Sequence, residues 1–190
     1  MTSTGPVSTW ARQLANRYLA EELPRRFAHV RGVGRRADQI AGILPAEEQD
    51  LLVGAAWLHD IGYATPLADT GFHQLDGARF LAAEGLPSRV CALVAHHAGA
   101  AAVARLCGFA DQLSAFEDEH TPLRDALWYC DMTTSPEGEP VSFPDRIAEI
   151  RRRRGPDDPV VLALAVNGDE RAAAVRRTEL LLGQSSRTAS

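Results

Sequence analysis

The sequence predicts an all-α protein, a single helical bundle formed by the whole chain of 190 residues. Apolar residues recur every three or four positions over most of its length, the spacing that places them on one face of a helix. No alternation of apolar and polar residues persists long enough to indicate a strand. Proline and glycine punctuate the apolar segments at the places where helices begin and end.

The first half of the chain contains three predicted helices. Each has apolar residues at helical spacing, and Pro24 and Pro45 separate one from the next. The third carries the sequence EEQDLLVGAAWLHDIGYA, and Gly62 marks where we expect it to end. The predicted helices cover about residues 10–19, 24–44 and 47–62.

The second half contains further predicted helices, again bounded by glycine and proline. Gly85 and Gly99 close the first two, Thr121 caps a later one, and Gly155 stops the next. The segment after Pro159 holds one or two helices, and the last eight residues are expected to be frayed. The predicted ranges are about 73–83, 87–97, 100–107, 122–132, 144–154 and 159–182.

Composition excludes several classes of protein. Apolar residues make up 45% and charged residues 24%, which is typical of a soluble globular domain, and no apolar run approaches the ~20 residues of a membrane-spanning helix. The net charge of -5 gives no general attraction to nucleic acid or to anionic membranes. All 20 basic residues are arginine. Catalysis by lysine is therefore excluded, and phosphate contacts must come from guanidinium groups, backbone amides or a metal.

Cysteine usage and the N-terminal sequence point to a reducing cytoplasm. Cys91, Cys107 and Cys130 are widely spaced in apolar stretches, so we expect three small buried side chains and no disulfide framework. The first residues do not form a secretory signal.

The arginine run 151–154 ends a predicted helix, where positive charge complements the helix dipole, so no nucleic-acid partner is expected. The C-terminal apolar segment packs on the core or on a second subunit, which makes a homodimer possible.

Several predicted helices are apolar until they end in histidine or aspartate. His59 and Asp60 end one of them, His96 and His97 end another, and Asp131 follows an apolar run in the same way. A buried carboxylate costs several kcal/mol unless something pairs with it. These helix ends are therefore expected to converge on a shared cation, because a metal ion neutralises carboxylates and accepts imidazole lone pairs.

The order of these residues resembles the HD-domain superfamily of metal-dependent phosphohydrolases. The signature His-Asp-Ile-Gly stands at 59–62, preceded by His29 and followed by Asp131, so the resemblance covers about Phe27 to Thr134. It implies one HD domain over residues 1–190, with a metal-binding core at about 27–134 and C-terminal helices at about 144–183. The segments FHQLDGARFL and VAHHAG are similar to the part of the family with a second metal, as in HD-GYP and diadenosine-tetraphosphate-type hydrolases.

The resemblance also implies a ligand set. His29, His59, Asp60 and Asp131 would hold the primary ion, and Asp60 would bridge to a second ion. Mixed imidazole and carboxylate ligands suit iron, manganese, zinc, cobalt or nickel rather than magnesium. One or two divalent transition-metal ions would then activate water for in-line attack on a phosphate ester or anhydride of a small, nucleotide-like substrate. The second ion would be held by His73, His96 and His97.

One position departs from the family pattern. Many members carry lysine directly after the signature, where it helps to bind phosphate, and this chain has Tyr63 there. Arginine would have to take over that contact. Arg79 is the first choice, as a catalytic partner of His59 and Asp60, because its predicted helix also carries His73. Arg124 and Arg146 are the other candidates, and His120 is expected to be a solvated loop residue.

The same ligands allow a second reaction class. Some HD-fold proteins with a diiron site are oxygenases that act on small polar substrates, and the ligands alone do not separate them from hydrolases. Tyr18 and Glu22, upstream of His29, could gate an oxygen-binding iron, although both also fit an ordinary amphipathic helix. A site that binds nucleotide without turnover is a third reading, against which the complete ligand set argues.

Overall fold

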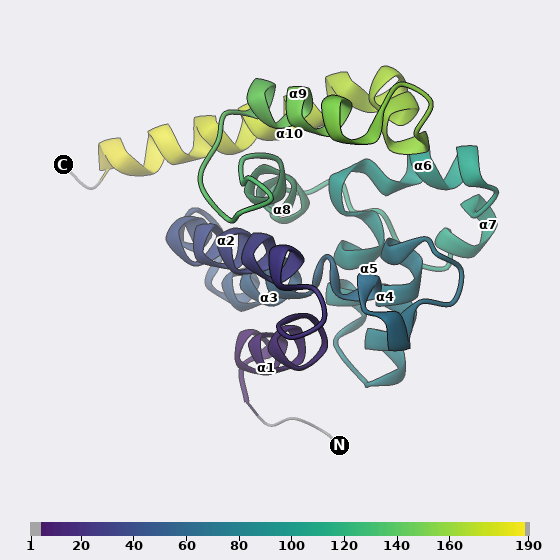
Figure 1. Ribbon diagram of the computed structural model, residues 1–190. Helices are drawn as coiled ribbons and strands as arrows, with labels where there is room; N and C mark the ends of the chain where they lie inside the picture. The colour runs from purple at the N-terminus through teal and green to yellow at the C-terminus, as the bar shows by residue number, and fades with distance from the viewer. Residues whose placement is uncertain (1–4, 189–190) are drawn as a thin grey trace.

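The computed structural model describes residues 5–188, and every regular element among them is helical. The all-α prediction is thus confirmed. Three helices at the N-terminal end pack on one another, and the next four form the side of the molecule that is teal in Figure 1. These helices are α1 (Val7–Leu19), α2 (Pro24–Ile40), α3 (Ala46–Leu58), α4 (His73–Ala83), α5 (Ser88–His96), α6 (Ala100–Cys107) and α7 (Ala110–Leu113).

Helix α8 (Pro122–Met132) lies at the centre of the fold, between these helices and a C-terminal layer. It is capped as predicted, since the Thr121 hydroxyl accepts a hydrogen bond from the backbone N–H of Arg124. The C-terminal layer consists of α9 (Phe143–Arg154) and α10 (Pro159–Thr188), and α10 packs along α8 and α6 (Figure 1). The segment after Pro159 is therefore one long helix.

Several predicted boundaries are wrong. The first helix begins at Val7 rather than at about residue 10, and the second ends at Ile40 rather than at residue 44, with a short 3-10 turn, Ala41–Ile43, after it. The third helix ends at Leu58 rather than at Gly62, and a short 3-10 turn, Ile61–Tyr63, follows. Residues 183–188, expected to be frayed, continue α10, because each further helical residue adds a backbone hydrogen bond without needing a packing partner. The last two residues of that prediction lie outside the described part of the chain.

Two cysteines are buried as expected, and one is not. Cys91 and Cys130 lie in the core, whereas Cys107 is exposed at the end of α6, before Gly108. The N-terminal three-helix layer and α8 share one apolar core, which includes Leu52, Leu58 and Leu127.

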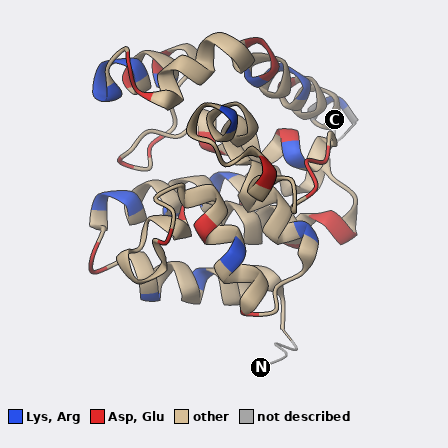
Figure 2. Ribbon diagram, turned by 90° about the vertical axis from the view of Figure 1, so that its right-hand side faces the viewer, with Lys and Arg blue, Asp and Glu red and all other residues tan. Residues whose placement is uncertain are grey.

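The segment Ser88–Cys107 is apolar and long enough, by composition, to cross a membrane. In the structure 72% of its most apolar window is buried, and a turn at His97–Gly99 divides it into α5 and α6. It is core, and it carries part of the site described next. Basic and acidic positions are interspersed along the ribbons in Figure 2, in keeping with the modest net charge of -5.

Candidate metal centre

Within residues 5–188, two groups of three side chains have their ligand atoms close enough together to hold a metal ion. In each group the atoms lie within 4.8 Å of one another. The first group is His29, His59 and Asp131, and the second is Asp60, His73 and His97. The groups are adjacent, since His59 Nε2 lies 3.4 Å from Asp60 Oδ2 and 4.0 Å from Asp131 Oδ1.

The ends of three helices bring these residues together. His59 directly follows α3, His97 directly follows α5, and Asp131 lies in the last turn of α8. A helix carries partial negative charge at its C-terminus, so three such ends create a local field that favours cations. The convergence predicted from the apolar helices is what the structure shows.

Backbone carbonyls fix the orientation of three of the imidazoles. The Nδ1 atoms of His29, His59 and His97 lie 2.9, 2.8 and 2.7 Å from the carbonyl oxygens of Ser135, Ala56 and Val94. A carbonyl only accepts, so each Nδ1 carries a proton and donates it. In the neutral ring Nε2 then presents its lone pair, the arrangement that metal-binding histidines share.

Asp60 lies between the two groups. Its Oδ1 is 3.3 Å from His73 Nε2 and 3.6 Å from His97 Nε2, while its Oδ2 accepts a 2.7 Å hydrogen bond from Arg26. Burial alone would raise the pKa of Asp60, but Arg26 and His59 hold it well below its usual range. The carboxylate is therefore ionised and faces both groups of imidazoles.

Asp131 is ionised for a related reason. Burial alone would raise the pKa of Asp131, but the contact with the His29 ring, whose Nε2 lies 3.1 Å away, and the positive charge of Arg146 hold it far below its usual range. Burial lowers the pKa of His73 to about 4, which keeps that ring neutral. For His59, burial is outweighed by Asp60 and Asp131, and its pKa is raised.

Gly62 allows the second group to form. A β-carbon at this position would lie 2.0 Å from the carbonyl oxygen of His73 and 2.6 Å from the backbone nitrogen of Gly77. The turn after His59 and Asp60 can thus touch the first turn of α4 only because residue 62 has no side chain.

Tyr63, in the place of the family's lysine, stacks on the His73 ring at 3.9 Å between centroids. Its contribution here is packing.

The loop before α4 is held by a carboxylate that the sequence analysis did not single out. Asp76 accepts hydrogen bonds from the backbone N–H groups of Asp69, Thr70 and Gly71 and from the Thr70 hydroxyl. These bonds fix the start of the helix that carries His73.

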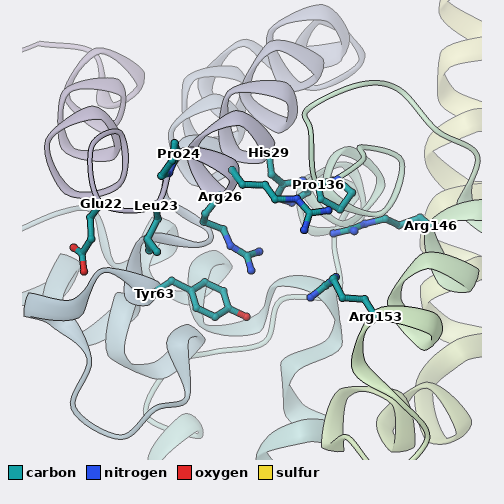
Figure 3. A pocket seen from close by; sticks show the side chains of 10 residues that line it. Glu22, Leu23, Pro24, Arg26, His29, Tyr63, Pro136, Arg146 and Arg153 are labelled. Carbon is teal, nitrogen blue, oxygen red and sulfur yellow. The ribbon is translucent and has the colours of Figure 1, made fainter.

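Arginine side chains surround the site. An outer pocket of about 340 Å³ is lined by Arg26, Arg146 and Arg153, which extend toward the same space above Tyr63 (Figure 3). A smaller inner pocket of about 60 Å³ shares these residues and reaches Asp60, Asp131, His29, His73 and His97. The inner pocket is also lined by Arg154 and Arg171.

Most of these arginines were not among the site residues predicted from the sequence. Arg26 is three positions before His29 on α2, and this spacing on one helix face was an available signal. Arg153 and Arg154 end α9 just before Gly155, as predicted for the arginine run, but they also face the inner pocket, where Arg154 lies 3.2 Å from the Tyr63 hydroxyl.

Two candidate site residues are not brought to the centre. The ring of His96 points elsewhere, and its Nε2 donates to the carbonyl oxygen of Phe116 at 2.9 Å. Arg79 is partly exposed, donates to Gln112 at 2.8 Å and pairs with Asp69 at 3.7 Å. Neither lines the inner or the outer pocket.

Arg124 and His120 pair with each other away from the centre, and Arg124 also contacts Glu170 at 2.6 Å. Tyr18 packs edge-on against Phe80, and Glu22 lies at the rim of the outer pocket, where it accepts a hydrogen bond from Thr65. Of the three arginines weighed for phosphate, only Arg146 faces the centre.

The residues fit a metal. Nε2 of His59 is buried and has no hydrogen-bond partner within residues 5–188, although its Nδ1 is well bonded. A buried polar atom without a partner costs free energy, so this atom is oriented for a ligand that the protein itself does not supply. Mixed imidazole and carboxylate donors suit a divalent transition metal.

Fold and site together define an all-helical domain that gathers histidine and aspartate at its helix ends in an arrangement that could hold divalent metal. The family model of the HD domain matches residues 26–135, more than half of the chain, and the protein belongs to this family. Comparison with curated proteins and with solved structures finds no match for the chain.

Proposed function

We propose that this protein is a metal-dependent phosphohydrolase that cleaves a phosphate ester or anhydride of a small, nucleotide-like substrate in the cytoplasm. The observation that carries the proposal is the anchoring of His29, His59 and His97 through Nδ1, which aims three Nε2 lone pairs at two ionised aspartates. The ligands fall into two groups, which favours two ions. Such ions supply Lewis-acid activation of water and neutralise charge on the reacting phosphate.

The protein's own residues position the substrate. The outer pocket has the volume of a small-ligand site, and Leu23, Pro24 and Tyr63 give it an apolar wall for the body of the substrate. The phosphate would extend from there into the inner pocket, beside the histidines and aspartates. Water attacks phosphorus, the bond to the leaving oxygen breaks, and the leaving group departs toward the outer pocket.

Removing the metal tests this function. A chelator should abolish release of inorganic phosphate from a panel of nucleotides and sugar phosphates, and one transition metal should restore it. The metal content of anaerobically purified protein identifies the ion. If the reconstituted protein holds two irons, consumes oxygen and releases no phosphate from the panel, the diiron oxygenase reading replaces the hydrolase.

Phosphate recognition provides a second test. Arg146 is buried, lies 3.8 Å from Asp131 and lines both pockets, so we assign it the phosphate contact first expected of Arg79. A charge-assisted contact contributes roughly 1.5–3 kcal/mol. Arg146→Ala should therefore lower kcat/KM by about 10- to 100-fold at unchanged metal content.

Arg79→Ala is the matched variant, because it removes the same side chain at a partly exposed position. It should retain turnover close to that of the parent. The reverse order of effects would return the phosphate contact to Arg79 and contradict the assignment to Arg146.

A further inference from the structure

Arg171, on α10, is a buried guanidinium without a partner. Only 2% of the residue is exposed, and it makes no hydrogen bond or ion pair with any residue of the described chain, 5–188. By contrast, the other arginines of the inner pocket each contact a carboxylate: Arg26 with Asp60, Arg153 with Glu149, Arg154 with Asp158, and Arg146 with Glu149 and Asp131.

The fold makes room for this side chain at the metal centre. A β-carbon on Gly99 would lie 3.0 Å from Arg171 Nε and 2.2 Å from Asn167 Nδ2. Asn167 donates to the Gly99 carbonyl at 2.8 Å, which ties α10 to the turn that carries His97. Arg171 thereby lines the inner pocket together with Asp60, Asp131 and the histidines, although it lies outside the family match at 26–135.

An unpaired buried charge is costly. Burial lowers the pKa of Arg171 to about 10, so the guanidinium remains charged at neutral pH. Taking an ion out of water costs several kcal/mol even after the protein relaxes. The charge of Asp131 offsets only part of that cost, because within residues 5–188 no carboxylate forms a direct ion pair with Arg171. Metal ions at the neighbouring ligands would add positive charge to the same pocket. A bound anion from outside the protein would balance this positive charge.

We propose that Arg171 binds the terminal phosphate of the substrate as a dianion, so that the protein acts on phosphomonoesters or terminal phosphates and not on phosphodiesters. The size of the inner pocket supports this, because about 60 Å³ holds a compact end group and the larger outer pocket holds the rest. A diester carries one negative charge on its phosphate and a substituent on each side of it. This inference rests on the proposed function for the identity of the anion as phosphate.

The test compares two probes on the metal-containing protein, inorganic phosphate and dimethyl phosphate, by isothermal titration calorimetry at a pH where inorganic phosphate is a dianion. The parent should bind inorganic phosphate more tightly. Arg171→Met should weaken phosphate binding by about 10- to 100-fold and change dimethyl phosphate binding far less. Arg176→Met is the matched control, because Arg176 is an exposed arginine on the same helix.

Thermal unfolding adds a readout that a purely structural role would not produce. Because Arg171→Met removes an uncompensated buried charge, it should raise the Tm by several degrees in the absence of anion. Added phosphate should raise the Tm of the parent more than that of the variant at the same phosphate concentration. A structural arginine would give the opposite result, a lower Tm on replacement.

Arg171→Gln, which keeps polar atoms without the charge, serves if the methionine variant does not fold. The inference is overturned if either variant binds phosphate as tightly as the parent does. It is also overturned if the parent does not prefer phosphate to dimethyl phosphate. If phosphate binding depends on Arg171 but no substrate is hydrolysed, the hydrolase proposal fails and the anion site stands. If substrates are hydrolysed but phosphate binding does not depend on Arg171, the hydrolase proposal stands and the anion site at Arg171 fails.

Discussion

Replacing Asp60 with asparagine should remove both metal binding and turnover. Asparagine keeps the shape of the side chain but loses the charge that faces His59, His73 and His97, at 3.3–3.6 Å from their Nε2 atoms. Asp60 belongs to the second group and also lies beside His59 of the first. Loss of this charged ligand removes several kcal/mol of stabilisation from the reaction, so we expect a fall of about 10³-fold or more in kcat. Metal content by mass spectrometry and phosphate release measure the two effects.

His96→Ala is the control for this variant. It also removes a buried, polar side chain near the metal centre, but the His96 ring bonds to Phe116 and belongs to neither ligand group. Its metal content should equal that of the parent. Asp60→Asn protein that retains the parent's metal stoichiometry would contradict the ligand assignment.

Replacing His73 and His97 together with alanine should remove one ion and leave the other. These two residues supply the imidazoles of the second group, whereas His29, His59 and Asp131 would remain in place. We expect about one ion per chain, and turnover reduced as strongly as in Asp60→Asn, because a single ion cannot clamp the phosphate from both sides. Loss of all metal, or loss of none, would each argue against two separable ligand groups.

The helices and most of the candidate ligands that the structure brings together could be predicted from the sequence, because both depend on local patterns. Apolar spacing located the helices. The apolar stretches of α3 and α5 are each followed directly by histidine, which marked those residues as candidate ligands. The choice between His96 and His97 could not be made this way. It depends on where α5 ends: His96 is its last residue and bonds to Phe116, whereas His97, the first residue after the helix, places its Nε2 3.6 Å from Asp60.

The arginines were harder to predict for a different reason. An arginine in an amphipathic helix is by default a solvated residue, and nothing near Arg171 in sequence marks it as buried. Its position follows from the packing of α10 against the turn at Gly99, a contact between segments about 70 positions apart. Such contacts leave no periodic signal.

The ligands of the first group connect distant parts of the chain. His29 on α2 and Asp131 on α8 are separated by 102 positions. An ion held by both joins the two ends of a long loop, and because the unfolded chain lacks this geometry, binding shifts the folding equilibrium by mass action. A bound metal ion would therefore act as a cross-link as well as a cofactor. In a cell short of metal, such a protein would open more often and be degraded sooner, so metal supply would set its abundance together with its activity.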